Sequence, residues 1–166
     1  MIFVCVGSRP YQFDRLFRQL DMLCDQGRVA SEIFAQIGAS SYTPKNFRFV
    51  DFLSPEQFRG HIENADIVIS HGASGSIMAA LNAGKQVIAV TRLEKYGEHI
   101  NDHQVGINET LAEEKLVLSV FDMNDLGDAI EALESGQVGL VPWVNERPGA
   151  VLEEIDRFIQ EKFGRE

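Results

Sequence analysis

Short apolar runs alternate along the chain with longer segments of mixed polarity. The short runs are typical of strands that are buried on both faces of a parallel sheet. They predict strands over residues 1–6, 32–37, 46–50, 65–69, 86–90 and 116–118. The segments between them predict helices from their periodicity and capping residues. These helices cover residues 11–25, 77–84, 99–111, 124–133 and 151–163, and a further helix begins at Ser54.

Strands that alternate with helices predict an α/β fold, in which a Rossmann-like parallel sheet carries helices on both faces. A chain of 166 residues suffices for one such domain. Two nucleotide-binding halves would each need ~120 residues or more. We therefore expect residues 1–166 to form a single domain. The most irregular segment is 135–148, where we expect Trp143 to pack against the sheet edge, with a partner-binding anchor as the alternative.

Composition narrows the class of protein. The formal net charge of −10 argues against direct binding to nucleic acid or to an anionic lipid surface. No apolar run approaches the ~20 residues that span a bilayer. Residues 1–6 lack the basic region and cleavage site of a signal peptide. We therefore expect a cytoplasmic protein, in which Cys5 and Cys24 are reduced core thiols.

The clearest candidate chemistry lies in the turn between the strand 65–69 and the helix 77–84. Gly72 and Gly75 allow a ligand to approach the main chain closely. The hydroxyls of Ser74 and Ser76 and the free N–H groups at a helix start all favour an anion. This turn therefore predicts a phosphate site with His71 at its edge. The alternative is an ordinary strand-to-helix turn that accommodates small residues.

A second glycine turn, Gly7-Ser8, follows the first predicted strand. Ligands of open α/β sheets bind at the carboxyl ends of the strands, where both turns would lie. Neither turn contains the G-x-G-x-x-G pattern of dinucleotide sites or a Walker loop, and no D-x-D metal signature occurs. We therefore expect no metal and no cofactor. A bound diphosphate would be neutralised by helix N-termini, hydroxyls and His71.

A polar cluster occupies residues 98–104. Gln104 falls on the same predicted helical stripe as Ile100 and Ile107, where a polar side chain requires a partner. His99, Asp102 and His103 share a neighbouring stripe. Several donors and acceptors at one helix start would suit a polyhydroxylated ligand such as a sugar. A solvated, well-capped helix start is the equally weighted alternative.

Several motifs in order resemble one protein family. They are His71–Ile77, Ala83–Ile88 and Lys95–Gln104, preceded by Val4–Ser8, Phe13–Leu16, Phe34–Gly38 and Tyr42–Asn46. Together they resemble the C-terminal domain of glycosyltransferase family 28, from residue 2 to about residue 135. Within that family the chain is most similar to PssE-type bacterial exopolysaccharide transferases. It is equally similar to the catalytic half of the split eukaryotic transferase that adds the second GlcNAc to dolichol diphosphate.

The resemblance implies the donor-binding half of a GT-B glycosyltransferase, which binds a UDP-sugar without metal and transfers the sugar with inversion. It implies a diphosphate site formed by Gly7, Ser8, His71, Gly72, Ser74, Gly75 and Ser76. It implies a donor-sugar site formed by Glu98, His99, Asn101, Asp102 and Gln104. The candidate catalytic groups are His71, His99 and Glu98, with His103 as a further candidate base. One departure is Ala79, which stands where many relatives carry a carboxylate for the ribose.

The size of the chain implies a partner. GT-B enzymes hold donor and acceptor in a cleft between two domains, and this chain supplies one wall. As in the split relatives, we expect a membrane-anchored subunit to carry the polyprenyl-diphosphate-linked acceptor of exopolysaccharide or capsule synthesis, and to hold this chain at the inner membrane. The alternatives are a non-catalytic nucleotide-sugar-binding subunit, an assembly subunit, and an unrelated phosphate-binding α/β domain.

Overall fold

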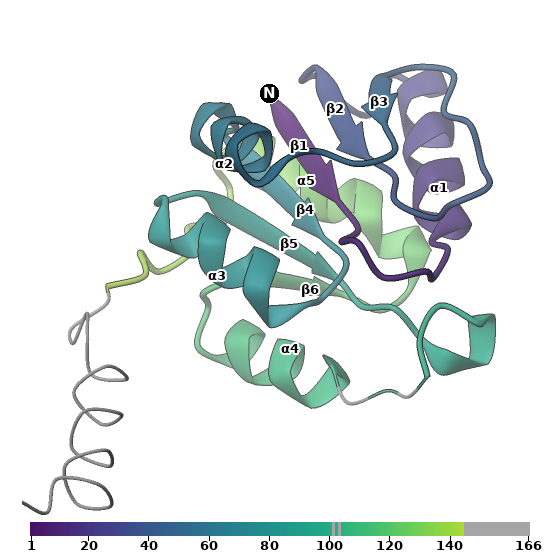
Figure 1. Cartoon of the computed structure of the whole chain (residues 1–166). Coiled ribbons are helices and arrows are strands. Elements are labelled where there is room, and N and C mark those ends of the chain that lie inside the picture. The colour runs from purple at the N-terminus through teal and green to yellow at the C-terminus, as the bar shows by residue number, and fades with distance from the viewer. Residues whose placement is uncertain (101, 103, 145–166) are drawn as a thin grey trace, which may run out of the picture.

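A computed structural model of the chain describes residues 1–100, 102 and 104–144. These residues form a six-stranded parallel sheet in the order β3-β2-β1-β4-β5-β6 (Figure 1). The strands are β1 (Ile2–Cys5), β2 (Ile33–Gln36), β3 (Arg48–Val50), β4 (Ile67–Ser70), β5 (Gln86–Val90) and β6 (Leu118–Val120). The predicted α/β fold is thereby confirmed.

Helices cover both faces of this sheet (Figure 1). They are α1 (Asp14–Asp25), α2 (Pro55–Asn64), α3 (Ser74–Asn82), α4 (Gln104–Glu113) and α5 (Leu126–Glu134), with short 3-10 turns η1 (Glu94–Tyr96) and η2 (Met123–Asp125). Side chains alternate along β1: Ile2 and Val4 pack with α1 and α5, whereas Phe3 and Cys5 pack with α2 and α3. Both faces of the central strands are therefore buried, as their apolar sequences require.

Local chemistry explains where α2 begins. The hydroxyl of Ser54 accepts a hydrogen bond from the Gln57 amide, and the Gln57 side chain accepts one from the Ser54 amide. This reciprocal pair is a capping box, and Pro55 occupies the first helical position. The predicted helix start at Ser54 is confirmed, and Ile62 is the buried residue of α2.

Helix α1 begins later than the predicted residue 11. Residues before Asp14 are held in a loop, because the Phe13 amide donates to the Ser40 hydroxyl over 3.0 Å. The Asp14 amide donates to the side chain of Gln12, so a glutamine side chain takes the place of a helical carbonyl at this end. The prediction missed these bonds because they join residues distant in sequence or use a side chain outside the helix.

The prediction for residues 99–111 was wrong in its start and in its buried face. Helix α4 begins at Gln104, and the apolar residues Ile100 and Ile107 are exposed. The buried residues of α4 are the polar Gln104 and Asn108. A buried amide is tolerated only with partners, and the Asn108 amide donates to the Thr91 hydroxyl over 2.9 Å. The inner side of α4 therefore serves polar contacts.

Strand β6 is shifted two residues from the predicted 116–118. Lys115 has φ of 57°, and the Leu116 amide donates to the Leu111 carbonyl oxygen. This is the left-handed termination of a helix, and it uses the residues that the prediction gave to the strand. Pairing with β5 therefore begins at Leu118, opposite Ile88.

The start of helix α5 also differs from the prediction. Helix α5 begins at Leu126 and not at the predicted residue 124, because Met123–Asp125 form the 3-10 turn η2, where the Asp122 carboxylate accepts from the Asn124 amide. Trp143 packs against the α2/α3 side of the core and donates to the Asn82 side chain over 2.9 Å, as its predicted packing role requires. The helix predicted over 151–163 lies outside the described residues.

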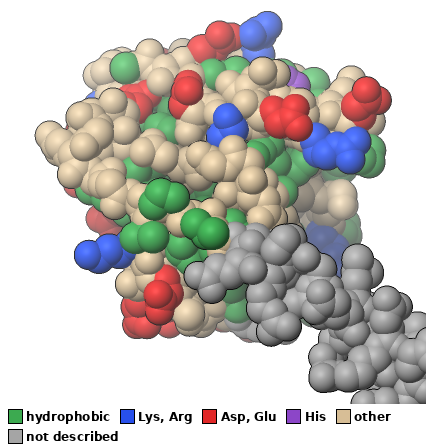
Figure 2. All heavy atoms as spheres, turned by 90° about the vertical axis from the view of Figure 1, so that its left-hand side faces the viewer, with side chains coloured by type: hydrophobic (Ala, Val, Ile, Leu, Met, Phe, Trp, Pro, Cys, Tyr) green, Lys and Arg blue, Asp and Glu red, His purple; other side chains and the backbone are tan. Residues whose placement is uncertain are grey.

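Charge is mixed on the face of the molecule that Figure 2 shows, where acidic and basic side chains are interspersed with apolar ones. Cys5 and Cys24 are free thiols, and burial raises the pKa of the Cys5 thiol to about 12. None of the described helices is both long enough and apolar enough to cross a bilayer.

Candidate functional site

The candidate site lies where the strand order reverses. From β1 the chain adds β2 and β3 on one side, and β4 then pairs with β1 on the other side. Cys5 and Ser70 are paired at the ends of β1 and β4, so the loops that follow them are neighbours. The space outside such a reversal is where open α/β sheets bind ligands. The structure thus brings the predicted Gly7-Ser8 and His71–Ser76 turns together.

His71 joins these two loops from a buried position. It is 6% exposed, and its Nδ1 lies 3.1 Å from the Cys5 carbonyl oxygen. Because a carbonyl oxygen only accepts, Nδ1 carries the hydrogen and Nε2 of the neutral ring is an acceptor. A Cβ atom on Gly7, where φ is +75°, would lie 2.8 Å from Nε2. Glycine is therefore required for the first loop to run this close to the imidazole.

The His71 ring is neutral in this setting. The pKa of His71 is lowered to about 3, chiefly by burial and also by the nearby Arg92 guanidinium and His99, while the hydrogen bond to the Cys5 carbonyl oxygen acts in the opposite direction. The sequence suggested that His71 helps to neutralise a phosphate. In the free protein a neutral imidazole adds no positive charge, so charge neutralisation must come from other groups.

Helix α3 opens toward the same space. Its N-cap is Ala73, with no capping hydrogen bond from a side chain among the described residues, and Ser74 and Gly75 are exposed. The first amides of α3 therefore remain available to an anion. Ser76 differs from its prediction, because its hydroxyl turns inward to donate to the Ala73 carbonyl oxygen and lies 2.7 Å from the Ser70 hydroxyl.

Gly72 connects this turn to α4. Its φ is +87°, and a Cβ there would lie 2.6 Å from the Asn108 amide nitrogen and 3.3 Å from Thr91 Cα. The turn thus rests directly on the polar inner side of α4. The predicted need for glycine at this position has a physical cause, which is close packing beneath the turn as well as a left-handed backbone.

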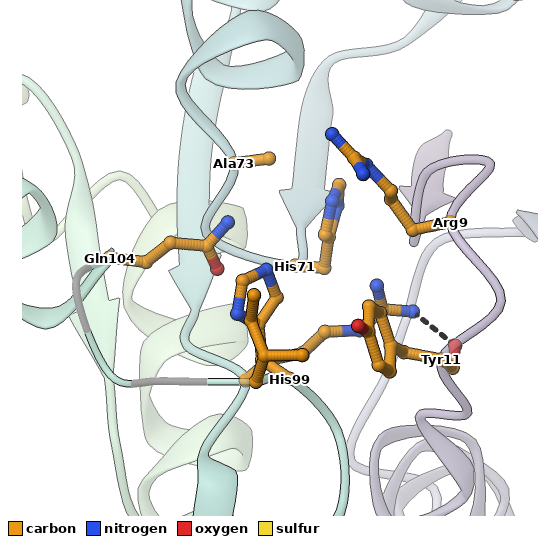
Figure 3. A pocket seen from close by; sticks show the side chains of 8 residues that line it. Arg9, Tyr11, His71, Ala73, His99 and Gln104 are labelled. Atoms are coloured by element: carbon orange, nitrogen blue, oxygen red, sulfur yellow. Dashed lines mark hydrogen bonds between the residues drawn. The ribbon is translucent and has the colours of Figure 1, made fainter.

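A cavity of about 320 Å³ lies beside these loops (Figure 3). It is lined by Arg9, Tyr11, His71, Ala73, Arg92, His99, Ile100 and Gln104. Of these residues, Gln104 has a buried Oε1 acceptor with no hydrogen-bond partner among the described residues. The centroids of the His99 and Tyr11 rings, which both line the cavity, lie 5.4 Å apart. Two predicted sugar-site residues, His99 and Gln104, therefore lie close to His71.

Arg92 was missed by the sequence analysis. It is 1% exposed, its Nη2 donates to the Tyr11 carbonyl oxygen over 2.9 Å (dashed line in Figure 3), and its guanidinium lies over the Phe13 ring. Burial lowers the pKa of Arg92 to about 10, and Glu98 partly opposes this effect. The available signal was a charged residue directly after a buried strand, at the carboxyl edge of the sheet.

Glu98 has a different environment from the one its motif implied. It is 1% exposed, and its oxygens accept from Arg15 over 2.6 and 3.0 Å and from the Leu93 amide over 3.0 Å. Its carboxylate is therefore committed to an ion pair that ties α1 to the loop after β5. It is not among the residues that line the cavity.

The other predicted residues are placed as follows. Ser8 is exposed on the loop after β1, and Asp102 is exposed and accepts from the Glu94 amide over 2.7 Å. Asn101 and His103 lie outside the described residues. Ala79 lines a separate groove of about 440 Å³ between α2 and α3. No three His, Cys, Asp or Glu side chains in the described part of the chain are grouped to hold a metal ion.

Comparison with known proteins decides the family. The model of the glycosyltransferase family 28 C-terminal domain matches residues 1–138. The chain belongs to this family. No curated protein sequence matches the chain. Family membership accounts for the order of motifs from β1 to α5, because the matched region includes all of these elements.

Solved glycosyltransferases share the fold of this family 28 domain. MurG of Acinetobacter baumannii superposes with a TM-score of 0.60 at 16% identity, over 95% of this chain and 49% of its own. The spinosyn forosaminyltransferase SpnP gives 0.58 at 16% identity, over 81% and 35%. VinC in complex with dTDP gives 0.53 at 18% identity, over 80% and 33%. The chain thus spans half or less of each of these enzymes, and its fold is that of the C-terminal half of GT-B glycosyltransferases.

Proposed function

We propose that this chain is the donor-binding subunit of an inverting, metal-independent glycosyltransferase that uses a UDP-sugar. The observation that carries the proposal is the uncapped N-terminus of α3, which opens beside a polar cavity at the reversal of strand order. A diphosphate placed there would accept hydrogen bonds from the first amides of α3. The Gly7-Ser8 loop would close over it from the neighbouring strand.

The cavity lining favours a sugar beside the diphosphate. Gln104 presents a buried acceptor without a partner among the described residues, and a sugar hydroxyl is a donor that would satisfy it. His99 lines the same cavity. We assign the donor sugar to this end and the diphosphate to the end formed by Ala73 and α3. Preorganised dipoles at α3 would stabilise the charge that develops on the departing UDP.

Two of the candidate general bases of this chain, Glu98 and His71, are poorly suited to the role. Glu98 is held in an ion pair, and a His71 pKa of about 3 makes that imidazole a poor base near neutral pH. We therefore propose that a membrane-anchored partner supplies the second wall, the polyprenyl-diphosphate-linked acceptor and the base, with His99 as the candidate within this chain. Purified chain alone should bind donor and transfer sugar slowly or not at all. Robust transfer without a partner would reject this division of labour.

One substitution tests the donor site without removing a residue that the fold needs. Ala73→Asp places a carboxylate at the N-cap of α3, where it would bond the same amides that we assign to the diphosphate. Such a cap stabilises a helix by about 1 kcal/mol. The variant should therefore unfold at a temperature equal to or above that of the wild type while losing UDP binding.

The matched control is Ser54→Asp, which places the same carboxylate at the N-cap of α2, where the Ser54 hydroxyl already caps the helix. UDP binding by this variant should equal that of the wild type in isothermal titration. GDP, dTDP and then the corresponding sugars, titrated into the wild type, rank the nucleotide and sugar preference. If A73D binds UDP as tightly as the wild type does, the α3 amides are not the diphosphate site.

Ala79 bears on the choice of nucleotide. Its side chain offers no carboxylate to the ribose hydroxyls. Any preference for uridine over other nucleosides must therefore come from other residues, and the titration series measures that preference. A non-catalytic nucleotide-sugar-binding subunit remains the second candidate, since His71 and Glu98 are both poorly placed as bases. It would bind donor and show no transfer in the presence of its partner.

A further inference from the structure

Arg92 is a buried cation with few partners. Its guanidinium can donate five hydrogen bonds. Among the described residues it donates one, from Nη2 to the Tyr11 carbonyl oxygen, and its Nε has no acceptor. Among the described residues no carboxylate forms an ion pair with it; Glu98 is near enough to attract its charge but is paired with Arg15. At 1% exposure it also has little contact with solvent.

Such an arrangement is costly in a protein interior. A buried charge that lacks a counterion loses its hydration, and folded proteins normally pair it or bond it fully. Arg15 provides a contrast within the same region, because it donates to both oxygens of Glu98 and to the Thr91 carbonyl oxygen. Of these two arginines, the one that lacks acceptors, Arg92, is the one that lines the cavity.

The position of Arg92 suggests which group serves as its missing acceptor and counterion. The side chain lines the cavity together with His71 and Ala73, and its charge acts on the His71 ring. Ala73 opens the α3 N-terminus, which already favours an anion. Arginine presents a planar set of donors that matches the oxygens of a phosphoryl group. An anion in the cavity would thus satisfy both a helix terminus and an unpaired cation.

We infer that Arg92 binds a phosphoryl group of the donor diphosphate and supplies the positive charge that His71 does not. This inference rests on the proposed donor-binding function and adds to it a residue that the family motifs did not indicate. In this assignment Arg92 stabilises the diphosphate both in the bound donor and as it leaves with UDP. The ligand then needs no bound cation for charge neutralisation at this site.

The test compares a charged and a neutral ligand. Arg92→Gln keeps a polar amide near the position of Nε but removes the charge and the Nη2 bond to the Tyr11 carbonyl oxygen. UDP affinity should fall about 10- to 100-fold, the range expected for a lost hydrogen bond to a charged group. Uridine affinity should stay within about twofold, since uridine lacks the diphosphate. Arg28→Gln is the control, because Arg28 is paired with Asp128 and Glu131 on the surface and should leave both affinities unchanged.

A second measurement uses the unaltered protein and so does not depend on the folding of R92Q. The Nε–H resonance of Arg92, assigned in the wild type by its absence from the spectrum of Arg92→Lys, should shift on addition of UDP or inorganic pyrophosphate. It should not shift with uridine. Equal loss of UDP and uridine affinity in R92Q, or no response of this resonance to saturating UDP, would overturn the inference.

The two proposals fail in distinguishable ways. If the wild type binds UDP and R92Q binds it equally well, the donor-binding function stands and the role of Arg92 is refuted. If the wild type binds inorganic pyrophosphate through Arg92 but does not bind UDP, the anion site stands and the nucleotide-sugar function is refuted.

Discussion

Replacing Glu98 by alanine should destabilise the protein more than it should affect donor binding. Glu98 is 1% exposed and accepts three hydrogen bonds, two from Arg15 and one from the Leu93 amide. Its removal leaves a largely buried guanidinium and a backbone amide without their acceptor. Breaking a buried pair in this way costs about 3–5 kcal/mol.

The structure places the expected loss toward the lower end of that range. The Arg15 side chain is 19% exposed, so water reaches part of it, and it retains the Thr91 carbonyl oxygen as an acceptor. Its guanidinium also lies over the Phe13 and Tyr96 rings. We expect a loss of about 3 kcal/mol in the free energy of unfolding. For a chain of this size the corresponding fall in Tm is about 6–12 °C.

Urea unfolding followed by circular dichroism measures this loss, and a surface pair provides the control. Glu32 pairs with Arg48, and their side chains are 61% and 76% exposed. Glu32→Ala should cost less than about 1 kcal/mol. Replacing both buried partners, as Arg15→Met with Glu98→Leu, should recover much of the stability lost in Glu98→Ala, because an apolar pair leaves no unpaired charge. If Glu98→Ala costs no more than Glu32→Ala but abolishes donor binding, the sugar-facing role implied by the family motif is correct and the ion-pair role is wrong.

Two further predictions concern the turn after β4. Gly72→Ala should cost about 2–4 kcal/mol of unfolding free energy in urea, because its Cβ would overlap the Asn108 amide at a backbone angle that disfavours alanine, whereas Gly60→Ala in α2 has open space and should be neutral or slightly stabilising. Because the pKa of His71 is lowered in the folded state, its contribution to stability is present above pH 6.5 and is lost as pH falls toward about 3. The wild type should therefore lose about 2 kcal/mol more than His71→Gln between pH 7 and pH 5, and equal losses would show that His71 is accessible to protons.

Much of the fold follows from local pattern, because its strands are short and apolar and are separated by recognisable caps. The strand centres and the α2 cap are governed by residues adjacent in sequence. The errors occur where distant groups decide the boundary. Ser40 holds Phe13 outside α1, and the left-handed Lys115 ends α4 and delays β6. The hydrophobic periodicity of the sequence contains no information about such long-range contacts.

The candidate site shows the same division. Glycine turns at Gly7 and Gly72 indicate a close approach of the backbone, and the structure brings both turns to the β1/β4 edge. Side-chain roles were harder to predict. Glu98 and Gln104 belong to one polar motif, yet Glu98 is held in an ion pair with Arg15 and only Gln104 lines the cavity. Which of two neighbouring polar residues faces a ligand depends on a partner such as Arg15, 83 residues away in the chain.

The charges around the cavity bear on the donor-binding role that we propose for this chain. Arg92 and the N-terminus of α3 are positive, His71 is neutral, and Glu98 is already paired. The cavity therefore attracts an anion, and none of the residues that line it is a carboxylate that would repel one. A base that deprotonates an acceptor needs the opposite environment, since nearby cations lower the proton affinity of histidine. Under the proposed function, donor binding and acceptor activation would favour opposite electrostatic environments, which is a physical reason for the proposed division of these two tasks between this chain and a partner.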